Sequence, residues 1–434
     1  MKKVLVIVNL FHASPRIPGL SAYFSEFGWE TTIVTPPINE AERTRLGFPN
    51  KFLKNARIIE ATYQGDVLWF WRKIFKFLGF KKNESLTEQI KESVGTTYRK
   101  SLINRLLYLY QAIFGYPDTE KTWIKPALKA VRKLLAEKKF DAILSSSPYP
   151  ASHMIAQKLK REFNIPWVAD FRDPWSQNHD YPYPKWRKRL DEKLELKIIK
   201  SANAIVAASP GYANKQSKFH NREVGVITNG FDPETIPFEK TALSKKFTIS
   251  YTGMIYEDKQ DPQKILAALK DLIKGNKIIA DKIELRFYGK KHAWLDEEIK
   301  KFNLQNIATQ YGPIPKEESV KRQIESQILL LLGWEDLSET GVYPQKVFEY
   351  LAAERPILIT GGSKNEDVKK LVAEANAGAS AITVEEIKKK LIELYNDYKQ
   401  NGFVRYGGDP KKIEQYSYRS MAQKFTEILN KIAR

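Results

Sequence analysis

Short apolar runs that suit buried strands alternate with helical stretches through almost the whole chain, and this alternation constrains the fold more than any other feature. The runs lie at 4–8, 30–35, 140–146, 166–170, 204–208 and 224–227 in the first half, and at 247–251, 283–288, 307–311, 328–332 and 357–360 in the second. Strands separated by helices form parallel sheets with crossover helices. The sequence therefore predicts an α/β protein with two parallel sheets in series.

A polar, proline-containing stretch separates the two series of strands, and a chain of 434 residues is long for a single core. We expect a Rossmann-like N-terminal domain at 1–230, with a helical insertion at about 66–116. A hinge at 231–246 leads to a second Rossmann-like domain at 247–415. The last segment, 416–434, is expected to be a helix that packs back toward the first domain.

Composition excludes several kinds of chemistry. The chain has no cysteine, which rules out disulfides, thiolate metal sites and cysteine catalysis. Five histidines argue against a centre with several histidine ligands. Lysine and arginine number 71 against 51 aspartate and glutamate, and the difference of +20 predicts an anionic partner.

The basic and aromatic run at 69–82 (WFWRKIFKFLGFKK) is the most unusual stretch of the insertion, and the run at 98–114 is similar. Interleaved aromatic and lysine side chains are typical of a helix that lies on an anionic membrane surface. The same pattern is equally typical of a helical hairpin packed on its own domain. Nothing else in the chain favours a nucleic-acid module.

The first apolar run fits a buried strand better than a secretion signal, and no run reaches the roughly 18 to 20 apolar residues of a spanning helix. We therefore expect a cytoplasmic protein, peripheral on the inner face of the cell membrane.

Residues 339–360 (ETGVYPQKVFEYLAAERPILIT) hold the strongest candidate for a binding site. Pro344 precedes a helical run, and the free N–H groups and dipole at a helix start favour an anion. Lys346 lies in the first turn, and Glu349 follows on roughly the same face. The pattern predicts a lysine that binds phosphate and a carboxylate that binds sugar hydroxyls. It is also typical of an ordinary amphipathic helix with a solvated lysine and glutamate.

The loop at 9–19, which includes Arg16 and Gly19, follows the first strand at its carboxyl end, where open α/β sheets bind ligands. It lacks the GxGxxG spacing of a dinucleotide site. His153 follows the 140–146 strand in the first turn of a helix, and we expect it to face the same crevice. A structural histidine would show the same pattern.

Asp170, Arg172 and Asp173 form a dense polar cluster at the end of the 166–170 strand. Two carboxylates around one arginine indicate either a structural ion network or part of an acceptor pocket.

Several short motifs occur in a characteristic order: Thr252-Gly253-x5-Lys259 after one strand, Tyr288-Gly289 after the next, Gly312-x-Ile314-Pro315, and then PQKVFEYLAAERPIL. The turn ITNGFD and the stretch ADFRDPW precede them in the first half. In this order the motifs resemble those of family-4 glycosyltransferases of the GT-B fold, over nearly the whole chain.

The resemblance implies two Rossmann-like domains that face each other across a cleft, and a hexosyltransferase that moves a sugar from a nucleoside-diphosphate donor to a glycan or lipid-linked acceptor. Retention at the anomeric carbon, a role in cell-surface polysaccharide synthesis, and the absence of a cofactor or catalytic metal are implied in the same way.

The resemblance also implies residue roles. Lys259 and Lys346 would contact the diphosphate, Glu349 the ribose, and the Ile314 backbone the base. His153 would lie beneath the transferred sugar. The list is completed by Gly253, Thr340 and Gly341 on the donor side, and by Arg16, Gly19, Asp170 and Arg172 on the acceptor side.

One position departs from the family pattern. The family has Glu-x7-Glu, and the place of the first glutamate is taken here by Gly341. Glu339, two residues away, is a candidate replacement. The missing carboxylate favours a second hypothesis, a degenerate GT-B scaffold that binds glycan, lipid or a partner without catalysis, and an epimerase of the same fold is a third.

Overall fold

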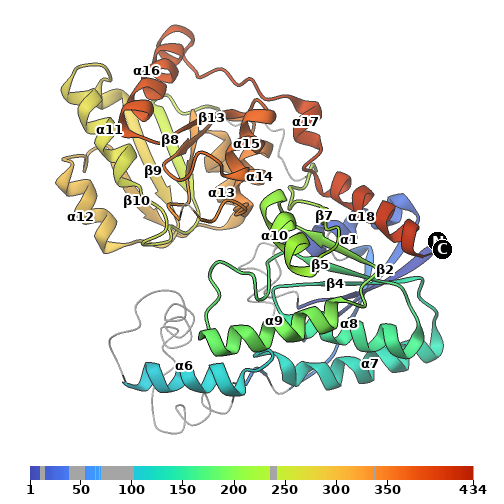
Figure 1. Ribbon diagram of the computed structural model, residues 1–434. Coiled ribbons are helices and arrows are strands. Elements are labelled where there is room, and N and C mark those ends of the chain that lie inside the picture. The colour runs from blue at the N-terminus through green and yellow to red at the C-terminus, as the bar shows by residue number, and fades with distance from the viewer. Residues whose placement is uncertain are drawn as a thin grey trace.

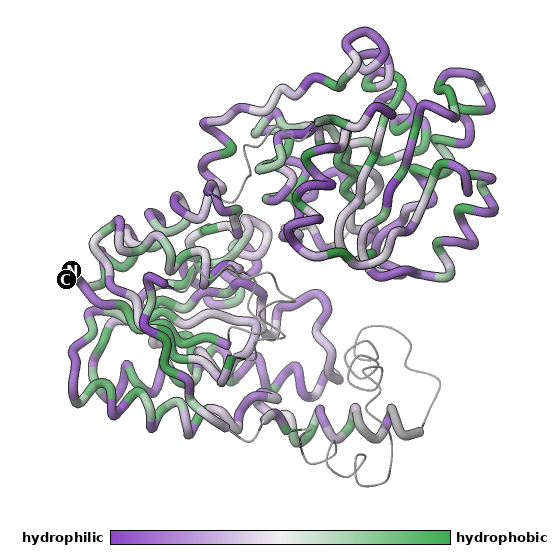
Figure 2. The backbone as a smooth tube through the Cα atoms, turned by 180° about the vertical axis from the view of Figure 1, so that it is seen from behind, coloured by the Kyte–Doolittle hydropathy of each residue, from purple (hydrophilic) through white to green (hydrophobic). Residues whose placement is uncertain are grey.

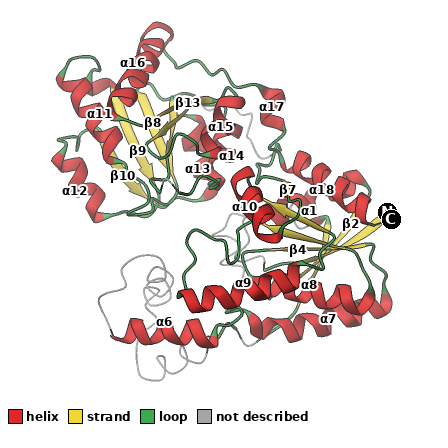
Figure 3. Ribbon diagram, in the orientation of Figure 1, coloured by secondary structure: helices red, strands yellow, loops and turns green. Residues whose placement is uncertain are grey.

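The computed structural model describes residues 1–9, 15–38, 54–63, 65–67, 69, 102–234, 242–336 and 338–433. It forms two α/β units, each built on one parallel sheet (Figures 1 and 3). Residues 70–101, which include most of the basic and aromatic run at 69–82, lie outside the described residues.

The first sheet has the strand order β3-β2-β1-β4-β5-β6-β7, and all its neighbours pair in parallel. Its strands are β1 (Lys2–Ile7), β2 (Trp29–Thr35), β3 (Ala56–Glu60), β4 (Ala142–Ser146), β5 (Trp167–Phe171), β6 (Ala204–Ala207) and β7 (Gly225–Val226). Its helices are α1 (Arg16–Tyr23), α6 (Leu102–Phe114), α7 (Ile124–Glu137), α8 (Pro150–Phe163), α9 (Lys185–Ile199) and α10 (Pro210–His220).

The second sheet has the order β10-β9-β8-β11-β12-β13 and is parallel as well. Its strands are β8 (Phe247–Thr252), β9 (Ile283–Tyr288), β10 (Ala308–Gly312), β11 (Ile328–Leu332), β12 (Ile357–Thr360) and β13 (Gly378–Ala381). Its helices are α11 (Gln263–Lys274), α12 (Ala293–Lys301), α13 (Lys316–Ile324), α14 (Gln345–Ala352), α15 (Asp367–Glu374) and α16 (Val384–Asn401).

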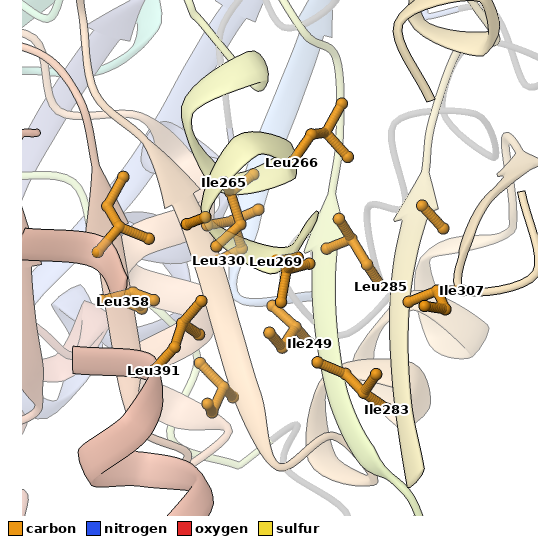
Figure 4. Close-up of a cluster of buried hydrophobic side chains, with 14 of the residues drawn as sticks. Ile249, Ile265, Leu266, Leu269, Ile283, Leu285, Ile307, Leu330, Leu358 and Leu391 are labelled. Atoms are coloured by element: carbon orange, nitrogen blue, oxygen red, sulfur yellow. The ribbon is translucent and has the colours of Figure 1, made fainter. Parts of the chain in front are cut away.

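Alternating side chains of the buried strands supply a core on each face of a sheet. In β1, Val4 and Val6 pack with α1, whereas Leu5 and Ile7 pack with α7, α8 and α9 on the other face. In the second unit, Ile249, Leu330 and neighbouring strand residues pack against α11 and α16 (Figure 4). Figure 2 shows hydrophobic segments in the strands and hydrophilic ones in the outer helices. Because both faces of the sheets are covered, most strands have continuous apolar sequences, and this is why they could be predicted.

The end of the chain belongs to the first unit. After α17 (Pro410–Glu414), Ser417 forms a bridge with Phe231, and α18 (Tyr418–Ile432) packs on α1. Phe425 and Leu429 of α18 lie in the same buried cluster as the strand β1.

The structure differs from the sequence-based expectation at the start of α1. The loop expected at 9–19 ends early, because α1 begins at Arg16. Gly19 faces α18, and a Cβ atom there would lie 2.5 Å from the ring of Tyr418. The lack of a side chain at Gly19 allows two helices to touch, which gives this glycine a packing role, and its expected acceptor-side role stays a prediction.

Candidate functional site

In both sheets the strand order reverses once, between β1 and β4 and between β8 and β11. Ligands of open α/β sheets bind outside the carboxyl ends of the strands at such points. Loops from the carboxyl ends of the two sheets meet here, since the Nζ of Lys259, after β8, lies 2.5 Å from the Oδ1 of Asp180, after β5. The candidate site lies where these loops meet, and it is called the cleft because the resemblance implies a cleft at this place.

The turn after β8 is built for close approach. Gly253 has a φ of 109°, and a Cβ atom there would lie 3.1 Å from the Nζ of Lys346. A Cβ atom at Gly289, after the neighbouring strand β9, would lie 2.1 Å from the carbonyl oxygen of Gly253. The positive φ of Gly253 and the close approach of the Gly253 carbonyl group to Gly289 therefore explain both glycines of the predicted motifs.

Lys346 lies in the first turn of α14, whose first N–H groups donate no hydrogen bond to an N-cap side chain, because the N-cap residue is Pro344. Its Nζ donates to the hydroxyl of Tyr251 and to the carbonyl oxygen of Met254 at 3.3 Å. Burial lowers the pKa of Lys346 to about 7, against the opposing effect of Glu349. The ammonium is held at the helix start that was predicted to bind an anion.

Glu349 lies one turn further along α14 and is 19% exposed. Its carboxylate pairs with Lys316, the first residue of α13, and accepts a hydrogen bond of 3.3 Å from Gln323. Lys316 directly follows the turn that contains Ile314, so this turn and Glu349 lie at the same end of the site. The structure therefore brings together the two groups that were expected to contact the nucleoside.

Lys259 reaches across the cleft. Besides its ion pair with Asp180, its Nζ lies 5.6 Å from the centre of the Trp334 ring. Hydrogen bonding from His179, and then from Lys259, lowers the pKa of Asp180 to about 2. Sequence reasoning missed His179 and Asp180, although the polar run SQNHD after the predicted strand at 166–170 could have indicated them.

Glu339 is fully buried and is bound by protein groups. Its Oε2 lies 2.6 Å from the Nζ of Lys215 in α10 and 3.4 Å from the Nδ1 of His179, and its Oε1 accepts from the N–H of Gly341 at 2.8 Å. These contacts join the two units. Because they engage both carboxylate oxygens, Glu339 does not replace the missing motif carboxylate in this structure.

Gly341 leaves no room for that carboxylate. A Cβ atom at Gly341 would lie 2.8 Å from the ring of Tyr212 and 3.0 Å from its backbone nitrogen. The preceding carbonyl group, that of Thr340, accepts a hydrogen bond of 2.8 Å from the N–H of Asp367. The departure from the Glu-x7-Glu pattern is thus part of how α10 packs on the second unit.

His153 does not face the cleft, contrary to the prediction. It is 0% exposed, its Nδ1 lies 2.8 Å from the Oγ of Ser145, and its ring packs near Phe171. Burial lowers its pKa to about 4. The helix α8 turns this side chain toward the sheet, so His153 is a neutral core residue in this structure.

Arg16 and Asp170 are also fully buried and pair with each other, so this structure gives them a structural role, and their expected acceptor contact stays a prediction. The Nε and Nη2 of Arg16 donate to the two oxygens of Asp170 at 3.0 and 2.8 Å, and Ser146 donates to the same carboxylate at 2.7 Å. This bidentate pair ties α1 to β5. Arg172 is partly exposed and lies 3.2 Å from Asp173, which leaves its predicted acceptor role open.

The partly exposed lysines of this arrangement suit the binding of a diphosphate. Two lysines, Lys259 and Lys346, flank a glycine turn and a helix start at one strand-end cleft, a combination that stabilises negative charge. Within the described part of the chain, no group of three or more acidic or histidine side chains is placed to hold a metal ion.

Comparisons with known proteins agree with this fold. Residues 95–235 match the model of Glycosyltransferase Family 4. Among curated proteins, none matches the chain by sequence. Sucrose-phosphate synthase from Thermosynechococcus elongatus is similar in structure, with 12% identity, a TM-score of 0.60 and 99% of each chain covered.

Two further solved structures have similar scores. HepE from Anabaena, in complex with UDP and glucose, has 11% identity and a TM-score of 0.61, with 99% of this chain and 100% of that chain covered. TarM from S. aureus, in a complex that includes UDP, has 11% identity and a TM-score of 0.58 at the same coverage. The predicted fold and resemblance are thus confirmed: the chain has the GT-B fold throughout, and its residues 95–235 are family-4 glycosyltransferase-like.

Proposed function

We propose that the protein is a retaining glycosyltransferase that moves a hexose from a nucleoside-diphosphate donor to a glycan or lipid-linked acceptor in cell-surface polysaccharide synthesis. The observation that carries this proposal is the position of Lys346, held against Gly253 at the start of α14. UDP is the first donor nucleotide to test, because the similar HepE and TarM structures contain UDP.

The site's chemistry follows from charge. When the bond between sugar and diphosphate breaks, negative charge grows on the leaving phosphate. Preorganised cations and helix N–H groups stabilise that charge more than they stabilise the bound donor, which lowers the barrier. Lys346 and Lys259 supply the cations in this proposal, and no metal or other cofactor takes part.

Glu349 would orient the donor through the ribose hydroxyls. Its pair with Lys316 fixes the carboxylate beside the turn that contains Ile314, where the base would contact the backbone. Retention is proposed from the family resemblance alone. Among the described residues of the site, no carboxylate pair is singled out of the kind that glycosidases place around the scissile bond, which favours transfer over hydrolysis.

The test is transfer or hydrolysis measured with a panel of nucleotide sugars. We expect turnover with at least one donor, and a loss on the order of 100-fold in Lys346→Ala. Lys274→Ala is the matched control, because Lys274 is exposed in the last turn of α11 and lies near Lys246, at the amino end of β8 and away from the candidate site. Equal loss in both variants would contradict the assigned site.

A degenerate scaffold is the second candidate, and the burial of Glu339 and the closed space at Gly341 favour it. This candidate predicts that nucleoside diphosphates bind with normal affinity while no donor in the panel is consumed. An epimerase, in contrast, would release free epimerised sugar without an acceptor.

A further inference from the structure

The helices on one side of the first sheet carry an unusual number of exposed apolar side chains. α6, α7, α8 and α9 all lie on this side (Figure 1). Half of the exposed large hydrophobic side chains in the described part of the chain belong to three of these helices: Leu109, Ile113, Phe114, Phe163, Trp186, Leu190 and Leu196. Such a concentration on one layer is a feature of interaction surfaces.

The outer stripe of α9 is apolar at its start and basic further along. Trp186 and Leu190, one turn apart, are 46% and 43% exposed. Lys193 and Lys197 continue the same stripe at helical spacing and are exposed as well. The buried residues of the helix, such as Asp191, lie on the opposite side, so the stripe points away from the domain.

α6 extends this surface. The first turn of α9 is bound to the end of α6, because the guanidinium of Arg187 donates to the carbonyl oxygens of Ala112 at 2.6 Å and Gly115 at 3.2 Å. Ile113 and Phe114, at that same end of α6, are 55% and 54% exposed. A buried arginine therefore fixes the start of α9 against the end of α6, and both of these segments carry exposed apolar side chains.

The charge around these apolar groups is almost entirely positive. The exposed basic side chains of α7, α8 and α9 are Lys125, Lys129, Arg132, Lys133, Lys158, Arg161, Lys185, Arg189, Lys193 and Lys197. The exposed acidic ones in these three helices are Glu137 and Glu162, and Glu162 pairs with Arg132 at 2.8 Å.

We propose that this surface, formed by the outer faces of α6 and α9 with the basic residues of α7 and α8, docks on an anionic lipid bilayer. Tryptophan and aliphatic side chains enter the headgroup boundary, where burial stabilises them, while lysines next to them meet anionic headgroups. A nucleic acid would use the lysines but not the aliphatic side chains at Leu190 and Ile113. No helix of the described residues is long and apolar enough to cross a membrane.

This docking deepens the proposed function, since a lipid-linked acceptor would be found at the same surface, but it does not depend on catalysis. Vesicle binding is measured without any nucleotide. Loss of docking would leave donor turnover on a soluble acceptor intact, and absence of turnover would leave docking intact.

The test is co-sedimentation of the full chain with phosphatidylcholine vesicles and with vesicles that contain equal parts of phosphatidylcholine and phosphatidylglycerol. We expect binding to the anionic vesicles only. Lys193→Glu/Lys197→Glu and Trp186→Ala/Leu190→Ser should each lower the partition coefficient by about tenfold or more. Lys274→Glu/Lys277→Glu, the same charge change on exposed residues of the second unit, should lower it by less than about threefold.

Circular dichroism and UDP titration of each variant check that folding and the cleft are unchanged. The proposal is overturned if the wild type does not bind anionic vesicles, if the control pair weakens binding as much as the α9 pairs do, or if both α9 variants bind as the wild type does. Binding of single-stranded RNA in preference to vesicles would also overturn it.

Discussion

The ion pair between Lys259 and Asp180 gives the sharpest prediction, because it occupies a lysine that we assign to the donor diphosphate. Substitution Asp180→Asn removes the competing carboxylate and should strengthen UDP binding. The side chain of Asp180 is 47% exposed, and that of Lys259 is 26% exposed. Pairs of this exposure contribute about 0.2 to 1 kcal/mol, which corresponds to a dissociation constant lowered by about 1.4-fold to fivefold.

The assay is isothermal titration of UDP into wild type and variant at pH 7.5. Since the pKa of Asp180 is lowered to about 2, its carboxylate is ionised at pH 7.5 and competes with the UDP diphosphate for Lys259. Asp258→Asn is the matched control, because Asp258 is exposed, precedes Lys259 directly, and loses the same charge. Weaker UDP binding in Asp180→Asn, or an equal gain in Asp258→Asn, would refute the assigned role of Lys259.

Three further predictions concern single groups. With a pKa of about 7, Lys346 is mostly neutral at pH 8, and a bound diphosphate favours its charged form. UDP binding at pH 8 should therefore take up nearly one proton. Calorimetry in two buffers of different ionisation enthalpy measures this uptake, which should be absent in Lys346→Met. Asp170→Asn removes the carboxylate that neutralises the buried charge of Arg16, and should lower the free energy of unfolding by about 3 to 5 kcal/mol in urea titrations, with UDP affinity unchanged. Because the pKa of His153 falls from 6.5 to about 4 on folding, the unfolded chain binds an extra proton between these pH values. The wild type should therefore lose about 2 kcal/mol of its free energy of unfolding between pH 7 and pH 5 through this group. His153→Gln should lack this loss, and its turnover should stay within about threefold of that of the wild type.

The strands could be predicted from sequence because most are buried on both faces, which requires continuous apolar runs such as Ile328–Leu332. β13 has the sequence GASA and packs little side-chain surface, so no apolar run marked it, and α16 after it was missed as well. Lys346 and Glu349 could be placed together because their spacing within one helix fixes their relation.

Contacts between distant segments could not be predicted. The pairing of Arg16 with Asp170 joins residues that are 154 positions apart, and both sequences look like exposed polar loop ends. The burial of Glu339 depends on Lys215 and on how α10 meets the second unit. Whether His153 faces the cleft or the core depends on how α8 is rotated about its own axis. The pattern of a strand followed by a helix does not fix that rotation.

Binding of a nucleoside diphosphate at the strand-end cleft should depend on Lys346 and Glu349. Titration of UDP, ADP and GDP into the wild type and into Glu349→Gln and Lys346→Met measures this dependence. We expect saturable binding of at least one nucleotide by the wild type, weakened about tenfold or more in both variants. Absence of binding by the wild type for every nucleotide, or equal affinities in all three proteins, would contradict it.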